Sequence, residues 1–234
     1  MIHDARVIDL LTNGDIDIVG RMANSSHATY LVNVGGEHSS VKGIYKPLVG
    51  ERPLWDFPPG LYKREVAAFR LSEALHFTVV PPTVLREGPA GEGSVQLYIE
   101  YDHTEHYFHL LDERPDTHDQ LRTMAVFDIV ANNTDRKGGH VLLDADDHVW
   151  GIDHGVCFSA DFKLRTVIWD FAGDDIAPVI VESLEKFVAQ IPLDVAALLT
   201  DDEIESMIDR TQWLIEHKVL PSAGSRYDYP WPIL

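Results

Sequence analysis

The sequence predicts an α+β fold with two lobes, a β-rich lobe over residues 1–101 and an α-rich lobe over residues 102–234. The first hundred residues contain short segments of alternating polarity separated by Gly- and Pro-rich turns, a pattern typical of strands. The remainder contains longer segments with apolar residues at helical spacing. Of the 234 residues 45% are hydrophobic, so the chain is long enough to bury a sizeable core.

The N-terminal segments predict a small sheet with one inserted helix. The helix is expected over 62–77, where Val66, Phe69 and Leu75 recur at helical spacing. The stretch GERPLWDFPPG at 50–60 contains three prolines and two glycines, so it predicts a loop before this helix. The expected strands are 15–20, 28–34, 41–46, 79–87 and 94–101.

The C-terminal segments predict a helical lobe that is interrupted by a short hairpin. Its two strands are expected at 140–143 and 148–152, around an acidic turn. The last helix opens with Asp201 and Asp202, which the helix dipole favours. The aromatic tail at 222–234 is expected to pack against the body. The expected helices are 121–133, 177–191, 195–200 and 201–220.

The charge balance argues against one class of partner. The chain carries 38 acidic and 19 basic residues, a formal net charge of −19. Nucleic-acid binding depends on Lys and Arg side chains that neutralise phosphates, so no nucleic-acid partner is expected. The same charge disfavours docking on an anionic membrane. A cleft with two or three cations would still be enough to bind a small phosphorylated ligand.

Three features predict a cytoplasmic protein. The chain contains no run of 18 apolar residues, so no membrane span is expected. The segment MIHDARVIDLL lacks the pattern of a signal peptide. The single cysteine, Cys157, excludes an internal disulfide and suits a reducing compartment. Its apolar neighbours indicate a core residue rather than a nucleophile.

Three polar residues around the predicted hairpin indicate phosphoryl transfer. Asp135 lies in the stretch Asn-Thr-Asp-Arg, His140 follows five positions later, and Asp153 lies in Ile-Asp-His-Gly after the hairpin. In phosphoryl transfer one acid orients the acceptor hydroxyl, while a later Asp and a polar residue hold Mg²⁺ against the ATP phosphates. The alternative is structural, with Asp135 and Arg136 forming a surface pair and Asp153 capping a turn.

The N-terminal lobe contains a lysine and a glutamate in the order that ATP-binding lobes need. A lysine on the third strand bridges the α- and β-phosphates, and a glutamate on the next helix holds it. Lys46 ends the third predicted strand and Glu65 lies early in the following helix. Lys42 competes on the same strand face, and Lys46 is favoured because it lies at the end facing the site. The alternative is that the strand lysine and the helix glutamate are solvated surface charges.

The turn between the first two strands, ANSSHATY, would lie over the phosphates. It has no GxGxxG pattern, but the hydroxyl and backbone N–H groups of Ser25 and Ser26 are candidates to bind phosphate oxygens. Ser-rich turns are also common without any ligand.

Taken together, these segments resemble the phosphatidylinositol 3-/4-kinase-like superfamily. The resemblance is strongest to the type II phosphatidylinositol 4-kinase branch, its bacterial relatives and an actinobacterial group with this kinase-like core, and it spans about residues 20–160. The most specific segments are Asn-Thr-Asp-Arg and Ile-Asp-x-Gly. The matching segments are NSSHATYLV, VKGIYKP, REVAAFRL, DIVANNTDRKGGHVLL and WGIDHGVCF.

The resemblance implies a bilobal protein-kinase-like fold with ATP between the lobes. In that case Asp135 orients the acceptor, Lys46 binds phosphate, Glu65 pairs with Lys46 and Asp153 ligates Mg²⁺. The stretch LYIEYD at 97–102, which includes Glu100, Tyr101 and Asp102, supplies the backbone hinge that binds adenine.

His140 is a departure from this family, which usually has Asn at that position. A neutral imidazole ligates Mg²⁺ poorly, because Mg²⁺ prefers oxygen ligands, whereas Mn²⁺ tolerates nitrogen better. The expected cofactors are therefore ATP with Mg²⁺ or Mn²⁺.

The function these observations favour is transfer of the ATP γ-phosphate to a hydroxyl of a protein or small molecule, in preference to a membrane lipid because of the charge. His140 keeps a second hypothesis open, a nucleotide-binding pseudokinase that acts through a protein partner. A third is a metal-dependent hydrolase that uses His103, His106 and His109.

Overall fold

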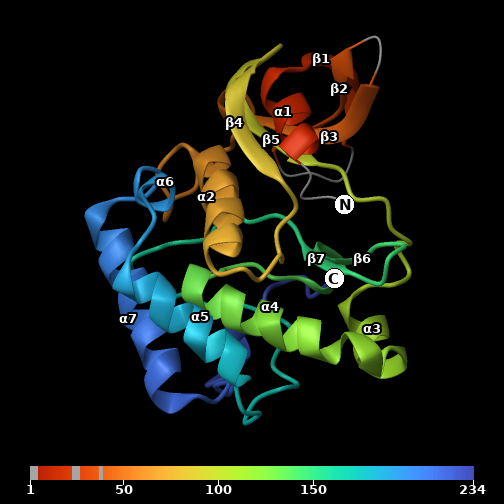
Figure 1. Ribbon diagram of the computed structural model, residues 1–234. Helices are drawn as coiled ribbons and strands as arrows, with labels where there is room; N and C mark the ends of the chain where they lie inside the picture. Colours follow the sequence, from red (N-terminus) through yellow and green to blue (C-terminus); the bar gives the residue numbers. More distant parts are fainter. Residues whose placement is uncertain (1–4, 23–26, 37–38) are drawn as a thin grey trace.

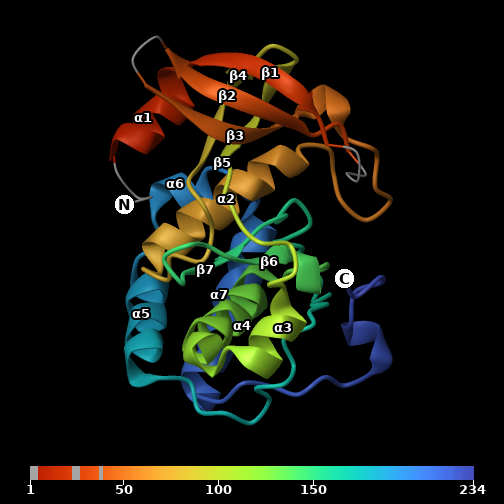
Figure 2. The same ribbon diagram turned by 90° about the vertical axis from the view of Figure 1, so that its right-hand side faces the viewer.

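The computed structural model describes residues 5–22, 27–36 and 39–234. Figures 1 and 2 show a sheet with α1 and α2 stacked over a lobe made mostly of helices. This is the predicted α+β architecture with two lobes, a β-rich N-terminal lobe and a mainly helical C-terminal lobe. Within the described residues no helix is both long and apolar enough to cross a membrane. The lobe boundary near residue 101 stays a prediction.

The N-terminal lobe is built on one antiparallel sheet of five strands, in the order β1-β2-β3-β5-β4. Its small core includes Val32, Val34, Tyr45 and Val95, together with Leu11 of α1. The strands are β1 (Asp15–Arg21), β2 (Tyr30–Gly36), β3 (Ser39–Pro47), β4 (Thr83–Gly88) and β5 (Gly91–Leu97).

The expectation of a single helix in this lobe is wrong, because α1 (Ala5–Asn13) precedes the sheet. A helix of nine residues is marginal alone, and α1 is held by packing against β2, β3 and β4. The predicted strand over 79–87 begins only at Thr83. Pro81 and Pro82 lack the N–H groups that a strand ladder needs.

Helix α2 (Leu61–Ala74) lies between β3 and β4 in the chain and faces the helical lobe. It begins after the Pro-rich loop, where the carboxylate of Glu51 accepts hydrogen bonds from the amides of Gly60 (2.8 Å) and Tyr62 (2.9 Å). These bonds satisfy N–H groups that have no partner inside the helix.

The C-terminal lobe surrounds α4 (His118–Ala131), whose apolar residues are nearly all buried. The hairpin of β6 (Val141–Leu143) and β7 (Val149–Gly151) lies beneath the sheet-bearing lobe. Phe127, Phe158 and Leu184 belong to the main core. The other helices are α3 (Tyr107–Glu113), α5 (Pro178–Ala189), α6 (Leu193–Ala196) and α7 (Asp201–His217).

Candidate functional site

Two adjoining cavities lie between the lobes. Thr29, Lys46, His140 and Asp153 line both of them. One cavity, of about 330 Å³, is rich in charged residues, namely Lys46, Glu51, Glu65, Asp135, Lys137 and Asp153. The other, of about 240 Å³, is mainly apolar and is lined by residues that include Ile44, Leu97, Ile99, Leu142 and Ile152. We call them the charged cavity and the apolar cavity.

Lys46 lies where the two cavities meet. From the end of β3 its Nζ contacts the Glu65 carboxylate and lies 2.8 Å from Asp153 Oδ1. Burial lowers the pKa of this amine, but the carboxylates of Asp153 and Glu65 outweigh burial and raise it, so Lys46 stays protonated. Lys42 instead pairs with Glu100 and leaves 52% of its side chain exposed, against 22% for Lys46.

Glu65 is held from both lobes. Only 3% of its side chain is exposed, so it is not a solvated surface charge. One carboxylate oxygen contacts Lys46, and the other accepts a hydrogen bond from the His154 amide at 3.0 Å. A Cβ on Gly155 would lie 3.3 Å from Glu65 Oε1, so the glycine leaves room for this carboxylate.

Asp153 faces both cavities from the segment after β7. Its φ of 62° is left-handed, a conformation that Asp tolerates better than most residues. The positive charge of Lys46 holds the pKa of its carboxyl well below the ordinary range. Oδ1 faces Lys46, and Oδ2 lies 3.5 Å from His140 Nε2. Asp153 therefore stays ionised between two other site residues.

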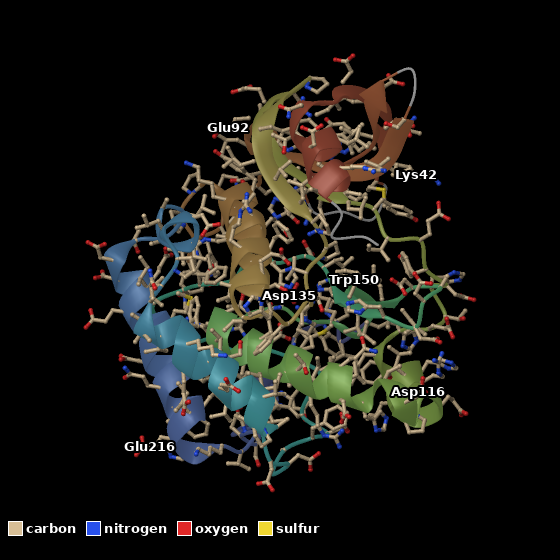
Figure 3. All side chains as sticks on the ribbon, in the orientation of Figure 1. Lys42, Glu92, Asp116, Asp135, Trp150 and Glu216 are labelled. Carbon is tan, nitrogen blue, oxygen red and sulfur yellow. The ribbon has the colours of Figure 1, made fainter. Side chains whose placement is uncertain are left out.

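Asp135 lies on the loop after α4, in the middle of the molecule between the two lobes (Figure 3). Helix α4 ends at Ala131, and the next residue, Asn132, has a left-handed conformation. Asn133 Oδ1 accepts a hydrogen bond from the Asp135 amide at 3.0 Å. The Asp135 carboxylate lies 3.0 Å from Lys137 Nζ. Burial raises the pKa of Asp135, and Lys137 opposes that shift.

Arg136 holds this loop from beneath, so the alternative of a surface pair between Asp135 and Arg136 is wrong. The fully buried guanidinium donates to both oxygens of Asp128, at 2.8 and 2.9 Å, and to the Ile152 carbonyl at 2.9 Å. It also donates to His154 Nε2 at 2.7 Å. Arg136 thereby connects the Asp135 loop with the Asp153 segment.

Three residues at or beneath the site were not singled out from the sequence, namely Asp128, Lys137 and His154. Asp128 had a detectable signal, because it is a charged residue inside the otherwise apolar face AVFDIVA. Such a residue requires a buried partner. Lys137 and His154 carried no comparable signal beyond being neighbours of predicted residues.

His140 lies at the end of a 3₁₀ turn, Gly138–His140, at the entry to β6. Its Nδ1 lies 3.0 Å from the Asp135 carbonyl oxygen. The Lys137 amide also faces Nδ1, but at 3.5 Å, so the carbonyl is the nearer partner. Because a carbonyl only accepts, this shorter contact assigns the hydrogen to Nδ1 and leaves a lone pair on Nε2, on the side of Asp153. Burial lowers the pKa of His140, which favours this neutral form.

Four residues of the predicted hinge at 97–102 line the apolar cavity, among them Tyr101. Strand β5 ends at Leu97, and Leu97, Tyr98, Ile99 and Tyr101 line the cavity. The Glu100 carboxylate pairs with Lys42 outside the cavity, and the Asp102 carboxylate accepts from the Thr104 amide and hydroxyl. Neither Glu100 nor Asp102 is among the lining residues.

The predicted phosphate-binding serines, Ser25 and Ser26, lie outside the described residues. The described residues after them, His27, Ala28 and Thr29, line the charged cavity.

The three histidines of the hydrolase hypothesis do not share one helix. His103 precedes α3 and is exposed, His106 lies just before the helix, and His109 lies within it. Across the described ranges no three His, Cys, Asp or Glu side chains gather closely enough to hold a metal ion by themselves. Cys157 is buried and burial raises its thiol pKa, as expected of a packing residue.

Comparison with known proteins gives one relative along nearly the whole chain. No protein-family model matches. The crystal structure of the Helicobacter pylori proinflammatory kinase CtkA aligns with 90% of this chain over 94% of its own length. The two chains are 12% identical in sequence, and the TM-score is 0.49. Protein Rv2133c of Mycobacterium tuberculosis is 35% identical, over 95% of this chain and 94% of that protein. The chain belongs to the same family as Rv2133c.

Proposed function

We propose that this protein is an ATP-dependent phosphotransferase of the phosphatidylinositol 3-/4-kinase-like type. The observation that carries the proposal is the position of Lys46. It contacts Glu65 and Asp153 where an apolar cavity meets a charged one. A pair between a strand lysine and a helix glutamate, beside a metal-binding Asp, is the arrangement that protein kinases use to hold ATP phosphates.

The two cavities match the two halves of a nucleotide. Adenine would enter the apolar cavity, against Ile44, Leu142 and the backbone of 97–99. The phosphates would then extend past Lys46 into the charged cavity, where the protonated amine attracts them. Lys137 adds a second cation 3.0 Å from the Asp135 carboxylate, close to where the transferred group would lie.

The donor set also fits a divalent ion. Asp153 Oδ2 and His140 Nε2 lie 3.5 Å apart, and no donor in the described ranges forms a hydrogen bond to Nε2. A bound ion would neutralise charge that develops on the phosphate oxygens. Two protein ligands suffice, since ions in such sites take further ligands from phosphates and water.

Asp135 is the candidate to accept the proton of the acceptor hydroxyl. It lines the charged cavity, and burial shifts its pKa upward, toward the value a general base needs. The acceptor would be a hydroxyl of a protein or a small molecule. The net charge of −19 opposes a lipid acceptor in an anionic membrane.

The test begins with calorimetry of ATP binding in Mg²⁺ and in Mn²⁺, comparing the native protein with Asp153→Asn. We expect metal-dependent binding that weakens at least tenfold in the variant. Absence of binding in both metals would overturn the proposal.

A second test separates binding from transfer. Asp135→Asn should bind ATP normally but transfer no γ-phosphate, measured with radiolabelled ATP against a mixture of candidate proteins and metabolites. Tight binding with no transfer by the native protein in either metal would favour the pseudokinase hypothesis, with a protein partner as the output.

A further inference from the structure

The candidate metal ligands include one nitrogen donor. Asp153 offers a carboxylate oxygen, which suits Mg²⁺ and Mn²⁺ alike. His140 offers Nε2, 3.5 Å from that oxygen. Two donors that share one ion lie about 3 Å apart, so the spacing is close to what a common ion requires.

The fold determines which ring nitrogen of His140 is available to a metal ion. Nδ1 lies 3.0 Å from the Asp135 carbonyl, nearer than the Lys137 amide at 3.5 Å, so we assign it as a donor to that carbonyl. The 3₁₀ turn that begins at Gly138 holds the ring in place. Metal-binding histidines nearly always donate their other ring N–H to a carbonyl or carboxylate, which orients the ring and leaves the free nitrogen toward the ion. His140 has this arrangement.

His27 shows the opposite arrangement in the same charged cavity. Its Nδ1 accepts a hydrogen bond from the Arg52 amide at 3.0 Å, so a neutral ring carries its hydrogen on Nε2. A protonated Nε2 has no lone pair for a metal. Of these two cavity histidines, only His140 therefore presents a free nitrogen.

We infer that this site selects Mn²⁺ over Mg²⁺ through His140 Nε2. The inference rests on the proposed function, because nucleotide phosphates and water would complete the coordination shell. Mg²⁺ loses its water reluctantly and takes oxygen donors, so an imidazole in place of an oxygen ligand disfavours it. Mn²⁺ is the weakest-binding ion of the first-row divalent series, but unlike Mg²⁺ it accepts an imidazole nitrogen beside oxygen donors.

The direct test is pulsed electron paramagnetic resonance of Mn²⁺ bound to the full-length protein, measured without nucleotide and with ADP. The expected signal is the ¹⁴N coupling of a directly bound imidazole. It should disappear in His140→Asn, which offers an oxygen instead, and persist in His27→Asn, the matched control. Circular dichroism of each variant checks folding.

A competition titration gives the size of the preference. The ratio of Mg²⁺ to Mn²⁺ dissociation constants in the presence of ADP should fall about tenfold or more in His140→Asn, which corresponds to about 1.4 kcal/mol. The His27→Asn ratio should equal that of the native protein.

The outcomes separate this inference from the proposed function. ADP bound with Mn²⁺ but without ¹⁴N coupling in the native protein would overturn the inference while the nucleotide site stands. A ¹⁴N coupling without any nucleotide binding would support the metal ligand and reject the phosphotransferase. If His140→Asn does not fold, the presence or absence of the ¹⁴N coupling in the native protein and in His27→Asn still tests the inference.

Discussion

Arg64 of α2 and Glu203 of α7 form a buried ion pair that joins the two lobes. Arg64 also donates to the Cys157 carbonyl at 2.6 Å, in the segment that follows Asp153. Because Glu65 is the next residue of α2, this pair helps to set where Glu65 lies relative to Lys46. The helical lobe thus positions part of the candidate nucleotide site.

Replacement of Glu203 by Leu should destabilise the protein and weaken nucleotide binding. It leaves the Arg64 guanidinium buried without its carboxylate, which typically costs about 3–5 kcal/mol of unfolding free energy. Urea unfolding and ATP calorimetry would measure both effects. The control is Glu205→Gln on the exposed side of the same helix, for which no change is expected. Equal stability of the two variants would contradict the role of the pair.

Asp128→Asn should also lower the unfolding free energy by several kcal/mol, on the order of 3, because Arg136 then lacks a buried counter-charge. The Asp135 loop and the Asp153 segment both depend on Arg136, so ATP affinity should fall as well. Thermal unfolding would detect the loss. Asp119→Asn on the same helix, where the carboxylate is 98% exposed, should leave the melting temperature unchanged. A shift as large as that of Asp128→Asn would argue against the buried pair.

Lys46→Met should weaken ATP binding by roughly 10- to 100-fold, since a charge-assisted contact is typically worth about 1.5–3 kcal/mol. Lys42→Met is the matched control, on the same strand but paired with Glu100 outside the cavities. Its ATP affinity should equal that of the native protein. Calorimetry of both variants decides which lysine serves the nucleotide, and a larger loss in Lys42→Met would reverse the assignment.

Stability should fall as the pH drops below about 6.5. The pKa of His154 lies well below its ordinary value, because burial and the Arg136 charge disfavour the protonated ring. The folded state therefore keeps His154 neutral, while the unfolded chain binds a proton below about 6.5. Each such histidine lowers the unfolding free energy by up to about 1.4 kcal/mol per pH unit. His140 acts in the same direction.

The variant His154→Gln tests this sign, because Gln still accepts from Arg136 but does not titrate. Urea unfolding between pH 7.5 and 5.5 should show a shallower decline in the variant. Identical slopes would assign the acid sensitivity to other groups.

The sequence alone was sufficient to predict the fold class and, for most segments, whether they form a helix or a strand. Alternation in the first hundred residues and helical spacing afterwards are local patterns, and they led to the five strands of the sheet and to α2, α4, α5 and α7. The short helices α1 and α3 were missed, because segments this short depend on tertiary packing more than on their own pattern.

The sequence also determined which residues to examine at the site, because Asp135, His140 and Asp153 have informative order and spacing. Only the tertiary structure decided how they are held. The contact of Lys46 with Asp153 and that of Arg136 with Asp128 depend on how the lobes and loops pack, and spacing along the chain carries no such information. The tautomer of His140 likewise depends on a single carbonyl 3.0 Å away. Local periodicity therefore specifies elements, whereas hydrogen bonds between distant segments specify the chemistry of the site.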